Sequence, residues 1–431
     1  MTFSIYTLGC KVNSYESNVM HDLLINEGYK ETLKDSKSDI VIINTCSVTN
    51  TADSKSLKLI KRCIKENEGA IVVVCGCYSQ ANSEVLEKLD GVSVILGTHD
   101  KSRVVDYIKE FIKNKKLIKK IYDMNNVGFD KMMLNNFDKT RAFVKIEDGC
   151  ENFCSFCIIP YLRGKVRSKD KDNVIDEIKT LVGEGHHEIV LTGIHTGHYG
   201  ADLDNYDFSD LLEDIIKIDG LERLRISSIE MNELNDKFME VLKKSPIIVD
   251  HIHIPIQSGC DKTLKDMNRK YYLDFFKKRI GVIRSIRPEM SISTDLIVGF
   301  PGETEEDFNI TLSTLEELKF SKIHCFPFSV RKGTKAETMD NQVKEEIKKE
   351  RVRKVIDLST KLEKEYMEKF VGRTMEFIPE VFKDGYFIGH TGNYLQVKVK
   401  AEGNLTHESL KCRLIEVNYP YIMGSLIDTH K

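Results

Sequence analysis

The sequence predicts an α/β protein of three consecutive parts: an N-terminal parallel α/β domain, an open barrel of six βα units and a small all-β barrel. Three observations carry this prediction. Short apolar stretches rich in β-branched residues alternate with helical stretches through the first two parts, as in βαβ units with parallel sheets. A polar, weakly periodic segment at 126–139 separates the two alternating runs. Short strands with no helices between them follow residue 370.

The N-terminal part is assigned to residues 1–125. Its expected strands are short and apolar: 3–8, 39–44, 70–75 and 92–96. Its expected helices lie between them: 14–28, 51–66 and 82–89. The alternation predicts one parallel sheet whose strands all end at the same edge.

The middle part is assigned to residues 138–370. Six strands are expected: 141–147, 187–192, 223–228, 248–254, 291–298 and 322–328. Six helices fall between or after them: 172–184, 208–217, 233–244, 273–287, 304–319 and 338–370. Six βα units favour an open barrel over the closed eight-fold one, with the chemistry at the carboxyl ends of the strands.

The C-terminal part is assigned to residues 371–431. It contains the strand-like strings EFIPEVF, YFIGHT, YLQVKVK, KCRLIEVNY and GSLIDT, separated by Gly, Asp and Asn. This pattern is typical of a small all-β barrel.

Composition limits the classes of function. Of the 431 residues, 41% are hydrophobic and 30% charged, with a net charge of −3, so a nucleic-acid surface would have to be local. No signal peptide and no run of about 18 apolar residues occurs, so we expect no membrane association and a cytoplasmic protein. Disulfides are rare in that compartment, and clustered cysteines among the eleven are therefore interpreted as metal ligands or catalysts.

Three cysteines follow the first strand of the middle part. Cys150, Cys154 and Cys157 are spaced C-x3-C-x2-C, and a compact loop of this kind can place three thiolates around one 4Fe-4S cluster. No fourth cysteine lies nearby in the sequence, so one iron would stay open for a substrate or cofactor. The alternative is a structural zinc site, but zinc normally has four ligands, commonly in C-x2-C pairs.

A second set of cysteines follows three strands of the N-terminal part. Cys10, Cys46 and Cys77 come after the first, second and third strands, so they are expected to meet at one sheet edge and to hold a second 4Fe-4S cluster. Cys75 is the rival third ligand, but it lies inside the apolar strand. The alternative for each is a small buried residue. The isolated cysteines are interpreted as packing residues: Cys63, Cys260, Cys325 and Cys412.

The C-x3-C-x2-C run after a first barrel strand resembles the radical S-adenosylmethionine superfamily. In that family the open iron binds the cofactor, and one electron cleaves it to a 5′-deoxyadenosyl radical. Two further stretches, 191–197 and 294–303, resemble its cofactor motifs, although each alone also fits a strand followed by a Gly-rich turn. The resemblance implies S-adenosylmethionine contacts at four residues: Gly193, Glu230, Gln257 and Gly299.

Strings along the whole chain resemble the methylthiotransferases. They are TLGCKVN at 7–13, NTCSVT at 44–49, GCYSQ at 76–80, RISSIE at 225–230 and HIPIQSG at 253–259. That family joins a three-cysteine domain, a radical S-adenosylmethionine barrel and a C-terminal TRAM domain. One branch carries Gly-Cys-Gln-Met-Asn and modifies isopentenyladenosine in tRNA, and another carries Gly-Cys-Pro-Lys-Asn and modifies a ribosomal-protein aspartate. The present Gly-Cys-Lys-Val-Asn resembles the branch acting on N6-threonylcarbamoyladenosine at position 37 of tRNA.

The resemblance implies a reaction with two clusters and two molecules of S-adenosylmethionine. Carbon 2 of adenine carries an unactivated hydrogen, which radical chemistry can remove and acid–base catalysis cannot. The barrel cluster would generate the radical, and the N-terminal cluster would present sulfur that a second S-adenosylmethionine methylates. A reductase would supply electrons.

The expected RNA target is the anticodon loop, since unpaired bases are accessible. Candidate tRNA contacts are Lys398 and Lys411 in the C-terminal barrel, and Arg163 and Arg167 after the barrel cysteines. The charged run at 344–373 alternates with Glu and is interpreted as a solvated helix face. The alternatives are methylthiotransferases with the other two substrates, and a non-catalytic RNA-binding protein that uses metal only for folding.

Overall fold

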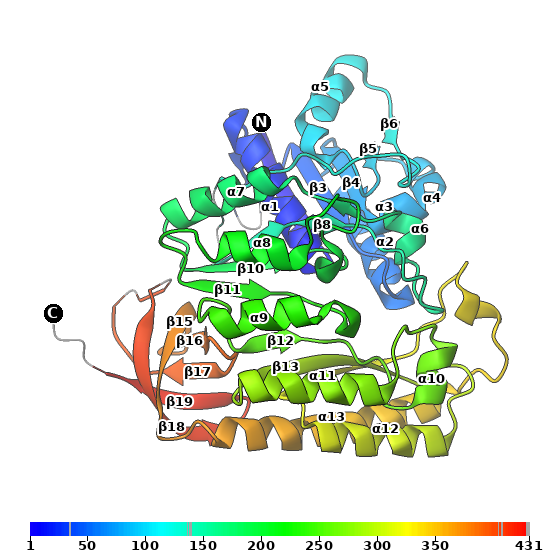
Figure 1. The fold of residues 1–431 in the computed structure, drawn as a ribbon. Coiled ribbons are helices and arrows are strands. Elements are labelled where there is room, and N and C mark those ends of the chain that lie inside the picture. Colours follow the sequence, from blue (N-terminus) through cyan, green and yellow to red (C-terminus); the bar gives the residue numbers. More distant parts are fainter. Residues whose placement is uncertain (34–35, 136, 138–139, 404, 407, 428–431) are drawn as a thin grey trace.

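The computed structural model describes residues 1–431 except 34–35, 136, 138–139, 404, 407 and 428–431. It confirms the predicted fold class: an N-terminal α/β sheet, six parallel strands with helices around them, and a C-terminal β-barrel (Figure 1). The assigned start of the middle part, residue 138, and the end of the last expected strand lie outside the described residues.

The N-terminal sheet has six parallel strands in the order β2-β1-β3-β4-β5-β6. They are β1 Thr2–Thr7, β2 Lys30–Glu31, β3 Ile40–Thr45, β4 Ile71–Gly76, β5 Val92–Leu96 and β6 Ile118–Lys120. The four predicted strands are confirmed. The edge strands β2 and β6 were not predicted, because two or three residues carry too little apolar pattern to be recognised.

Five α-helices accompany this sheet in the described residues: α1 Lys11–Asn26, α2 Asn50–Glu66, α3 Cys77–Ala81, α4 Ser83–Glu87 and α5 Val104–Asn114. Helix α2 begins where the Thr49 side chain accepts a hydrogen bond from the Ala52 amide, an ordinary N-cap. The helix expected at 82–89 is α4, whereas α3, which adjoins it at Asn82, was not predicted. Helix α5 was not predicted.

The barrel strands are β7 Arg141–Lys145, β10 Glu188–Thr192, β11 Arg223–Ile226, β12 His251–His253, β13 Ser291–Val298 and β14 Lys322–Pro327. They form two parallel three-stranded groups, which the parallel bridges Leu224–Ile248 and Ser228–His253 join into one run. No pairing among the described residues connects β7 to β14. The barrel is therefore open, as predicted.

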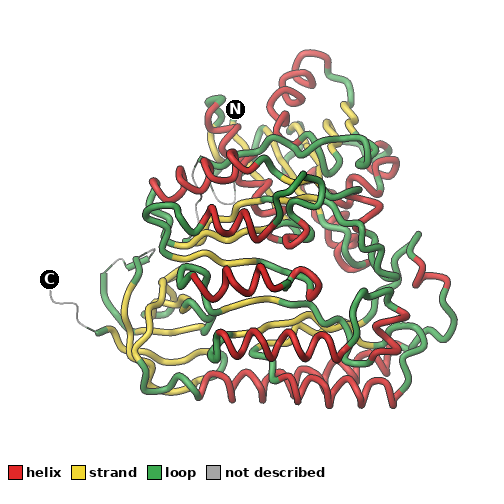
Figure 2. Tube along the Cα trace, in the orientation of Figure 1, coloured by secondary structure: helices red, strands yellow, loops and turns green. Residues whose placement is uncertain are grey.

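Helices stack along the outside of these strands (Figures 1 and 2). They are α7 Lys171–Gly183, α8 Phe208–Ile215, α9 Asp236–Lys244, α10 Asp261–Asp266, α11 Leu273–Ile286, α12 Glu305–Leu318 and α13 Glu345–Glu368. A short helix, α6 Ile159–Arg163, and a two-stranded pair, β8 Glu147–Asp148 with β9 Arg167–Ser168, follow β7. No helix of the described part is long and apolar enough to span a membrane.

The C-terminal strands close into a five-stranded barrel in the order β15-β16-β17-β19-β18. They are β15 Thr374–Lys383, β16 Tyr386–Thr391, β17 Gln396–Val399, β18 Leu410–Asn418 and β19 Tyr421–Leu426. The core of this barrel includes Tyr366 and Phe370, which come from the end of α13 and the turn after it. The C-terminal barrel is thus packed onto the last helix of the middle part.

Helix α1 belongs to two cores at once. Its Met20 and Leu24 pack under the N-terminal sheet, whereas Tyr15 and Val19 belong to the barrel core. The buried hydroxyl of Tyr15 hydrogen-bonds Glu177 Oε1 on α7 at 2.8 Å. Helix α1 therefore holds the end of the N-terminal sheet against the barrel.

Candidate active site

The loop with Cys150, Cys154 and Cys157 lies between β8 and α6. It is folded tightly: the Cys150 amide donates to the Gly164 carbonyl at 3.0 Å, and the Cys157 amide to the Cys154 carbonyl at 2.9 Å. Gly149 has φ +100°, and a Cβ at that position would lie 1.9 Å from the Lys165 carbonyl oxygen. Only glycine allows this close approach, which turns the chain into the cysteine loop.

The three thiols of this loop form one electrostatic group. Burial raises their pKa values, that of Cys157 to about 12, and charge on neighbouring thiols of the set raises those of Cys150 and Cys157 further. Arg269 acts in the opposite direction on Cys154 and Cys157, and its Nη1 lies 3.4 Å from Cys154 Sγ. These buried thiols need nearby positive charge to ionise, and the thiolate is the form that binds metal. Three thiolates in one loop fit the ligand set of an iron–sulfur cluster.

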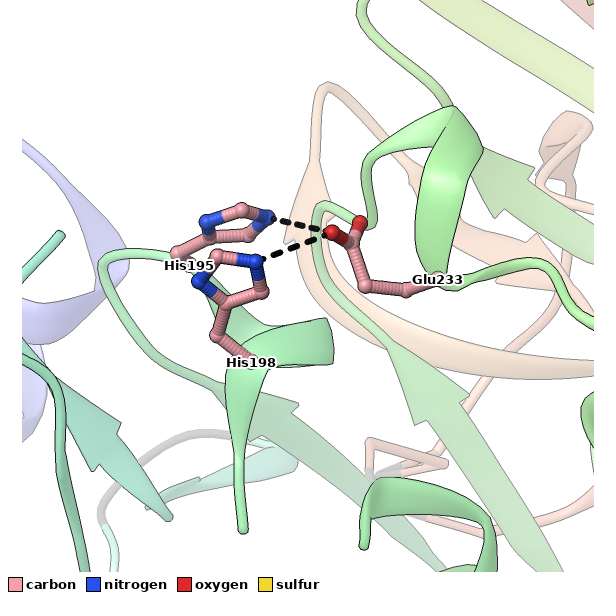
Figure 3. Close-up of side chains that lie close together, drawn as sticks. All are labelled: His195, His198 and Glu233. Carbon is pink, nitrogen blue, oxygen red and sulfur yellow. Dashed lines mark ion pairs between the residues drawn. The ribbon is translucent and has the colours of Figure 1, made fainter. Parts of the chain in front are cut away.

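Two histidines and a glutamate stand beside Cys150 (Figure 3). His195 Nδ1 lies 3.8 Å from Cys150 Sγ, and its ring stacks on that of His198 with centroids 3.6 Å apart. The Nε2 atoms of both rings lie 3.2 Å from Glu233 Oε1. Burial opposes ionisation of Glu233, but hydrogen bonds from the two histidines lower its pKa to about 2. The sequence analysis missed this group; the only signal was the position of His195 within the stretch 191–197.

The four residues predicted to contact S-adenosylmethionine lie on one rim. Gly193, Glu230, Gln257 and Gly299 follow β10, β11, β12 and β13, at the carboxyl ends of neighbouring strands. A Cβ on Gly193 would lie 2.7 Å from Glu147 Oε2, so glycine is required there.

Two of these four residues also contact other residues of the chain. Glu230 is ion-paired with Arg269, the same residue that approaches Cys154. The Gly299 amide donates to Glu303 Oε1 at 3.0 Å. Both residues therefore also stabilise the rim.

The structure brings the second cysteine set together as predicted. Cys10 precedes α1, Cys46 follows β3, and Cys77 begins α3 directly after β4. A Cβ on Gly9 would lie 3.1 Å from Cys46 Sγ, which places the first two loops in contact. Burial raises the pKa of the Cys10 and Cys46 thiols, and charge on Cys77 contributes in the same direction.

Cys75 occupies a different environment from Cys77. It is fully buried within β4 and packs in the apolar core under the N-terminal sheet, where burial raises its pKa to about 12. Of the isolated cysteines, Cys63 and Cys412 also lie in apolar cores. This placement agrees with the preference for Cys77 as the third member of the set.

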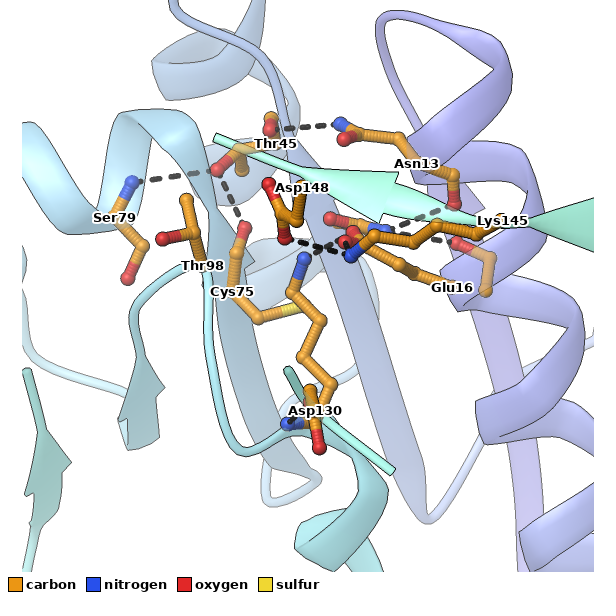
Figure 4. Close-up of polar contacts among 12 residues, drawn as sticks. Asn13, Glu16, Thr45, Cys75, Ser79, Thr98, Asp130, Lys145 and Asp148 are labelled. Carbon is orange, nitrogen blue, oxygen red and sulfur yellow. Dashed lines mark hydrogen bonds and ion pairs between the residues drawn. The ribbon is translucent and has the colours of Figure 1, made fainter. Parts of the chain in front are cut away.

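A buried ionic network connects α1, which follows Cys10, with the segments around the barrel cysteines. Figure 4 shows three of its members, Glu16, Lys145 and Asp148. Glu16 on α1 pairs with Lys101, with Lys145 at 2.9 Å and with Arg163 at 3.2 Å. Asp148 pairs with Lys145 at 2.7 Å and Arg163 at 3.1 Å. Although burial opposes ionisation, these cations hold the pKa values of Glu16 and Asp148 well below the usual range. Three cations and two carboxylates from the N-terminal part and the barrel are thus paired in one buried network.

Arg163 and Arg167, the two candidate tRNA contacts after the barrel cysteines, are both buried. Arg163 is fully buried, and its Nη2 donates to Asn13 Oδ1 at 3.1 Å. Arg167 is also buried and donates to the backbone carbonyls of Met124 and Lys165, both at 2.9 Å. Both guanidinium groups are therefore bound within the protein and are poorly placed to reach tRNA.

The other two candidate tRNA contacts lie on the C-terminal barrel. Lys411 is exposed on β18. Lys398 on β17 is half-buried, and its ammonium lies 4.3 Å from the centre of the Tyr386 ring and 5.5 Å from that of Tyr421. Both side chains remain candidates for phosphate contacts.

A cavity of about 440 Å³ lies where the three parts of the chain meet. Its wall includes Lys11 from α1, Arg225 and His251 from barrel strands, and His390 and Tyr394 from the C-terminal barrel. Burial, and then the charges of Arg225 and Arg141, lowers the pKa of Lys11 to about 8. Sequence analysis did not predict this cavity, because its wall is assembled from segments far apart in the chain.

Comparisons with known protein families match the first two parts of the chain. Residues 144–315 match the radical SAM superfamily, and residues 2–97 match a family described as "Uncharacterized protein family UPF0004". Both cysteine sets fall inside the matched ranges.

Several curated proteins are similar over almost the whole chain. The threonylcarbamoyladenosine tRNA methylthiotransferase MtaB of Bacillus subtilis is 41% identical, over 99% of this chain and 96% of that protein. The protein of the same name from Thermotoga maritima is 35% identical, over 97% of this chain and 99% of its own length. The tRNA-2-methylthio-N(6)-dimethylallyladenosine synthase of Acetivibrio thermocellus is 32% identical, over 99% and 91%.

Solved structures agree on the fold alone. The radical S-adenosylmethionine methyltransferase TsrM from Kitasatospora setae superposes with a TM-score of 0.56 at 12% identity, covering 76% of this chain and 71% of that one.

Proposed function

The chain belongs to the radical S-adenosylmethionine methylthiotransferases, and on this premise we propose that it methylthiolates carbon 2 of N6-threonylcarbamoyladenosine in tRNA. The observation that carries the proposal is the pair of three-cysteine sets, one at the end of each parallel sheet, with a shared buried network between them. A non-catalytic RNA-binding protein would need neither the rim of cofactor-type residues nor two such sets.

The two sets are assigned to two 4Fe-4S clusters. Cys150, Cys154 and Cys157 hold the barrel cluster, and Cys10, Cys46 and Cys77 hold the second. When bound, these clusters and S-adenosylmethionine supply the electron, the carbon radical and the methylated sulfur that acid–base chemistry lacks. Each set offers three thiol ligands, which leaves one iron of each cluster accessible.

The protein residues position these groups. Arg269 directs its guanidinium to Cys154 Sγ at 3.4 Å and is itself held by Glu230, so positive charge is fixed beside the barrel sulfurs. Hydrogen bonds to cluster sulfurs adjust the reduction potential. Gly193, Glu230, Gln257 and Gly299 are the proposed S-adenosylmethionine contacts, with glycines where the backbone has to approach closely.

The proposed substrate nucleoside is at position 37, beside the anticodon. The parts of the chain are proposed to be a methylthiotransferase domain at 1–125, the radical barrel at 138–370 and a tRNA-binding TRAM domain at 371–431. A reductase is the proposed electron donor. Lys398 and Lys411 are the proposed phosphate contacts, whereas Arg163 and Arg167 are assigned to the buried network.

Nucleoside mass spectrometry of tRNA tests the proposal. Cells that contain the gene should accumulate 2-methylthio-N6-threonylcarbamoyladenosine, and deletion should convert it to the form without the methylthio group. A loss of the methylthio group from dimethylallyladenosine instead would favour the second candidate, which rests on relatives of 32–36% identity. No change in either nucleoside would overturn both tRNA assignments.

A further inference from the structure

The cavity between the three parts reaches the start of α1, which directly follows a cysteine of the second set. Lys11, the first residue of α1, forms part of its wall and directly follows Cys10. The opposite wall consists of barrel strand residues, among them Arg225, His251 and Ser293. If a base is held next to the proposed second cluster, a substituent on that base could extend into this cavity.

The C-terminal barrel supplies the remaining wall. The Tyr394 ring stacks on His251 with centroids 4.5 Å apart, and the guanidinium of Arg225 lies 4.7 Å from the centre of the same ring. Arg225 Nη2 also donates to the Gly392 carbonyl at 3.1 Å. The C-terminal barrel is therefore part of the pocket, in addition to any contact that it makes with the tRNA body.

The wall of the cavity holds a lysine without an ion-pair partner among the described residues, together with buried polar atoms that have no hydrogen-bond partner. Lys322 is paired with Glu363 at 2.5 Å, but no carboxylate of the described residues lies within ion-pair distance of the Lys11 ammonium. Arg225 is only 1% exposed and pairs with Glu188 at 2.6 Å, yet its Nη1 has no hydrogen-bond partner. A buried donor without a partner is costly, so these atoms indicate a bound ligand with acceptor oxygens.

Further polar side chains line the cavity, beside the apolar Met367, Leu395 and Pro420. Ser293 Oγ bonds His251 at 3.1 Å and His253 at 2.9 Å, and the Ser291 and Ser321 hydroxyls lie 2.8 Å apart. The Nδ1 atom of His251 is buried and has no partner. An apolar substituent such as a dimethylallyl group would leave these atoms unpaired, whereas a group with carboxylate, hydroxyl and urea functions would satisfy them.

We propose that this cavity receives the threonylcarbamoyl substituent of the substrate, and that Lys11 and Arg225 bind its carboxylate. The inference rests on the proposed function and adds the residues that select the substrate.

Synthetic anticodon stem-loops test this selection with the full-length, cluster-reconstituted enzyme. One RNA carries N6-threonylcarbamoyladenosine, a second carries its methyl ester, which lacks the negative charge, and a third carries unmodified adenosine. Dissociation constants are measured by fluorescence anisotropy for the wild type, Lys11→Gln and Arg225→Lys. Lys361→Gln, an exposed lysine paired with Glu316 on the outside of α12, is the matched control. Formation of 5′-deoxyadenosine without RNA checks that the barrel cluster remains intact, and the iron content checks that the second cluster does.

The wild type should bind the carboxylate form about ten- to hundredfold more tightly than the ester, the range expected for hydrogen bonds to a charged group. Lys11→Gln should lose most of this preference, because its binding of the carboxylate form should weaken much more than its binding of the ester. Lys361→Gln should keep it, and Arg225→Lys should retain a reduced preference.

Equal binding of acid and ester by the wild type would overturn the carboxylate site even if Lys11→Gln failed to fold. Full discrimination in a folded Lys11→Gln protein would exclude Lys11. A fourth stem-loop, with isopentenyladenosine, is assayed for methylthiolation beside the threonylcarbamoyl one. Methylthiolation of the isopentenyladenosine RNA alone would refute the proposed function, a result distinct from both others.

Discussion

Arg163 and Glu16 form an ion pair, Nη1 to Oε1 at 3.2 Å, in the interior of the protein. Arg163 ends the helix after the barrel cysteines, and Glu16 lies on the helix after Cys10. The two loops proposed to hold clusters are thus connected by charges with little or no access to solvent. A buried charge that loses its partner is far more costly than an exposed one, so the network fixes the distance between the two loops.

Glu16→Gln should destabilise the protein by about 3 kcal/mol, since it leaves Lys101, Lys145 and Arg163 with one carboxylate fewer in a buried site. Urea unfolding of the anaerobically reconstituted protein measures the change. Glu27→Gln is the control, because Glu27 lies just after the same helix and pairs with an exposed lysine, Lys109. It should change stability by less than about 1 kcal/mol. If Glu16→Gln and Glu27→Gln reduce stability equally, the buried network is not the source of the loss.

The same network predicts how stability responds to acid. Its cations hold the pKa of Glu16 and Asp148 below the unfolded values of about 4, so the stabilisation is complete above that pH and is lost as the pH falls further. The wild type should therefore lose stability more steeply below about pH 4 than Glu16→Gln does. If the free energy of unfolding falls equally steeply below about pH 4 in both proteins, Glu16 is not the source of the acid sensitivity.

Metal content tests the two cysteine sets. Anaerobically reconstituted protein should bind about eight irons per chain, since two cubanes are proposed. Replacement of Cys150, Cys154 and Cys157 by Ala should remove about half, and so should replacement of the N-terminal set. Cys75→Ala is the matched control, and it should leave the iron content unchanged because its thiol is buried in the apolar core. Wild-type protein that loads only zinc would refute the enzyme assignment.

The two sets should also differ in function. Loss of Cys10, Cys46 and Cys77 should abolish methylthiolation but leave reductive cleavage of S-adenosylmethionine detectable, because the cofactor rim lies on the barrel strands. Cleavage is followed as 5′-deoxyadenosine, and iron content and absorption confirm that the barrel cluster is retained. Disappearance of cleavage with that cluster intact would show that the division of labour is wrong.

The sequence predicted the longer strands, and the cysteines at their ends, because both signals are local. Strand β4 is one apolar run, and Cys77 comes directly after it at the start of α3, so its position is recognisable without knowledge of any neighbouring segment. The barrel cysteines are closer still, within one loop of eight residues, 150–157. The parallel topology then predicts that the three N-terminal cysteines meet, since the carboxyl ends of parallel strands share an edge.

What the sequence did not predict depends on distant segments. Arg163 looked like a surface residue because its partners, Glu16 and Asp148, are identified only when α1 packs on the barrel. The ion pair of Glu233 with His195 joins the loop after β11 to the loop after β10. The cavity required the position of the C-terminal barrel, whose Tyr394 contacts the barrel residue His251.

Salt dependence tests the proposed phosphate contacts of the C-terminal barrel. Each lysine that neutralises one phosphate contributes about 0.7–0.9 to the slope of log K against log salt. Lys398→Ala and Lys411→Ala should each weaken binding of full-length tRNA and flatten this slope by roughly one unit. Lys109→Ala, on the N-terminal part, is the control and should not change the slope.

Lys398 needs an additional measurement, because its ammonium lies near the Tyr386 and Tyr421 rings and the side chain also contributes to packing. A purely structural role would lower the thermal midpoint of Lys398→Ala and leave the salt slope unchanged. A phosphate contact would flatten the slope, and Lys398→Arg would restore it, since arginine keeps the charge. If both lysine variants bind tRNA with the wild-type slope across a salt series, the C-terminal barrel acts through the cavity wall at Tyr394 and not through the phosphates of the tRNA.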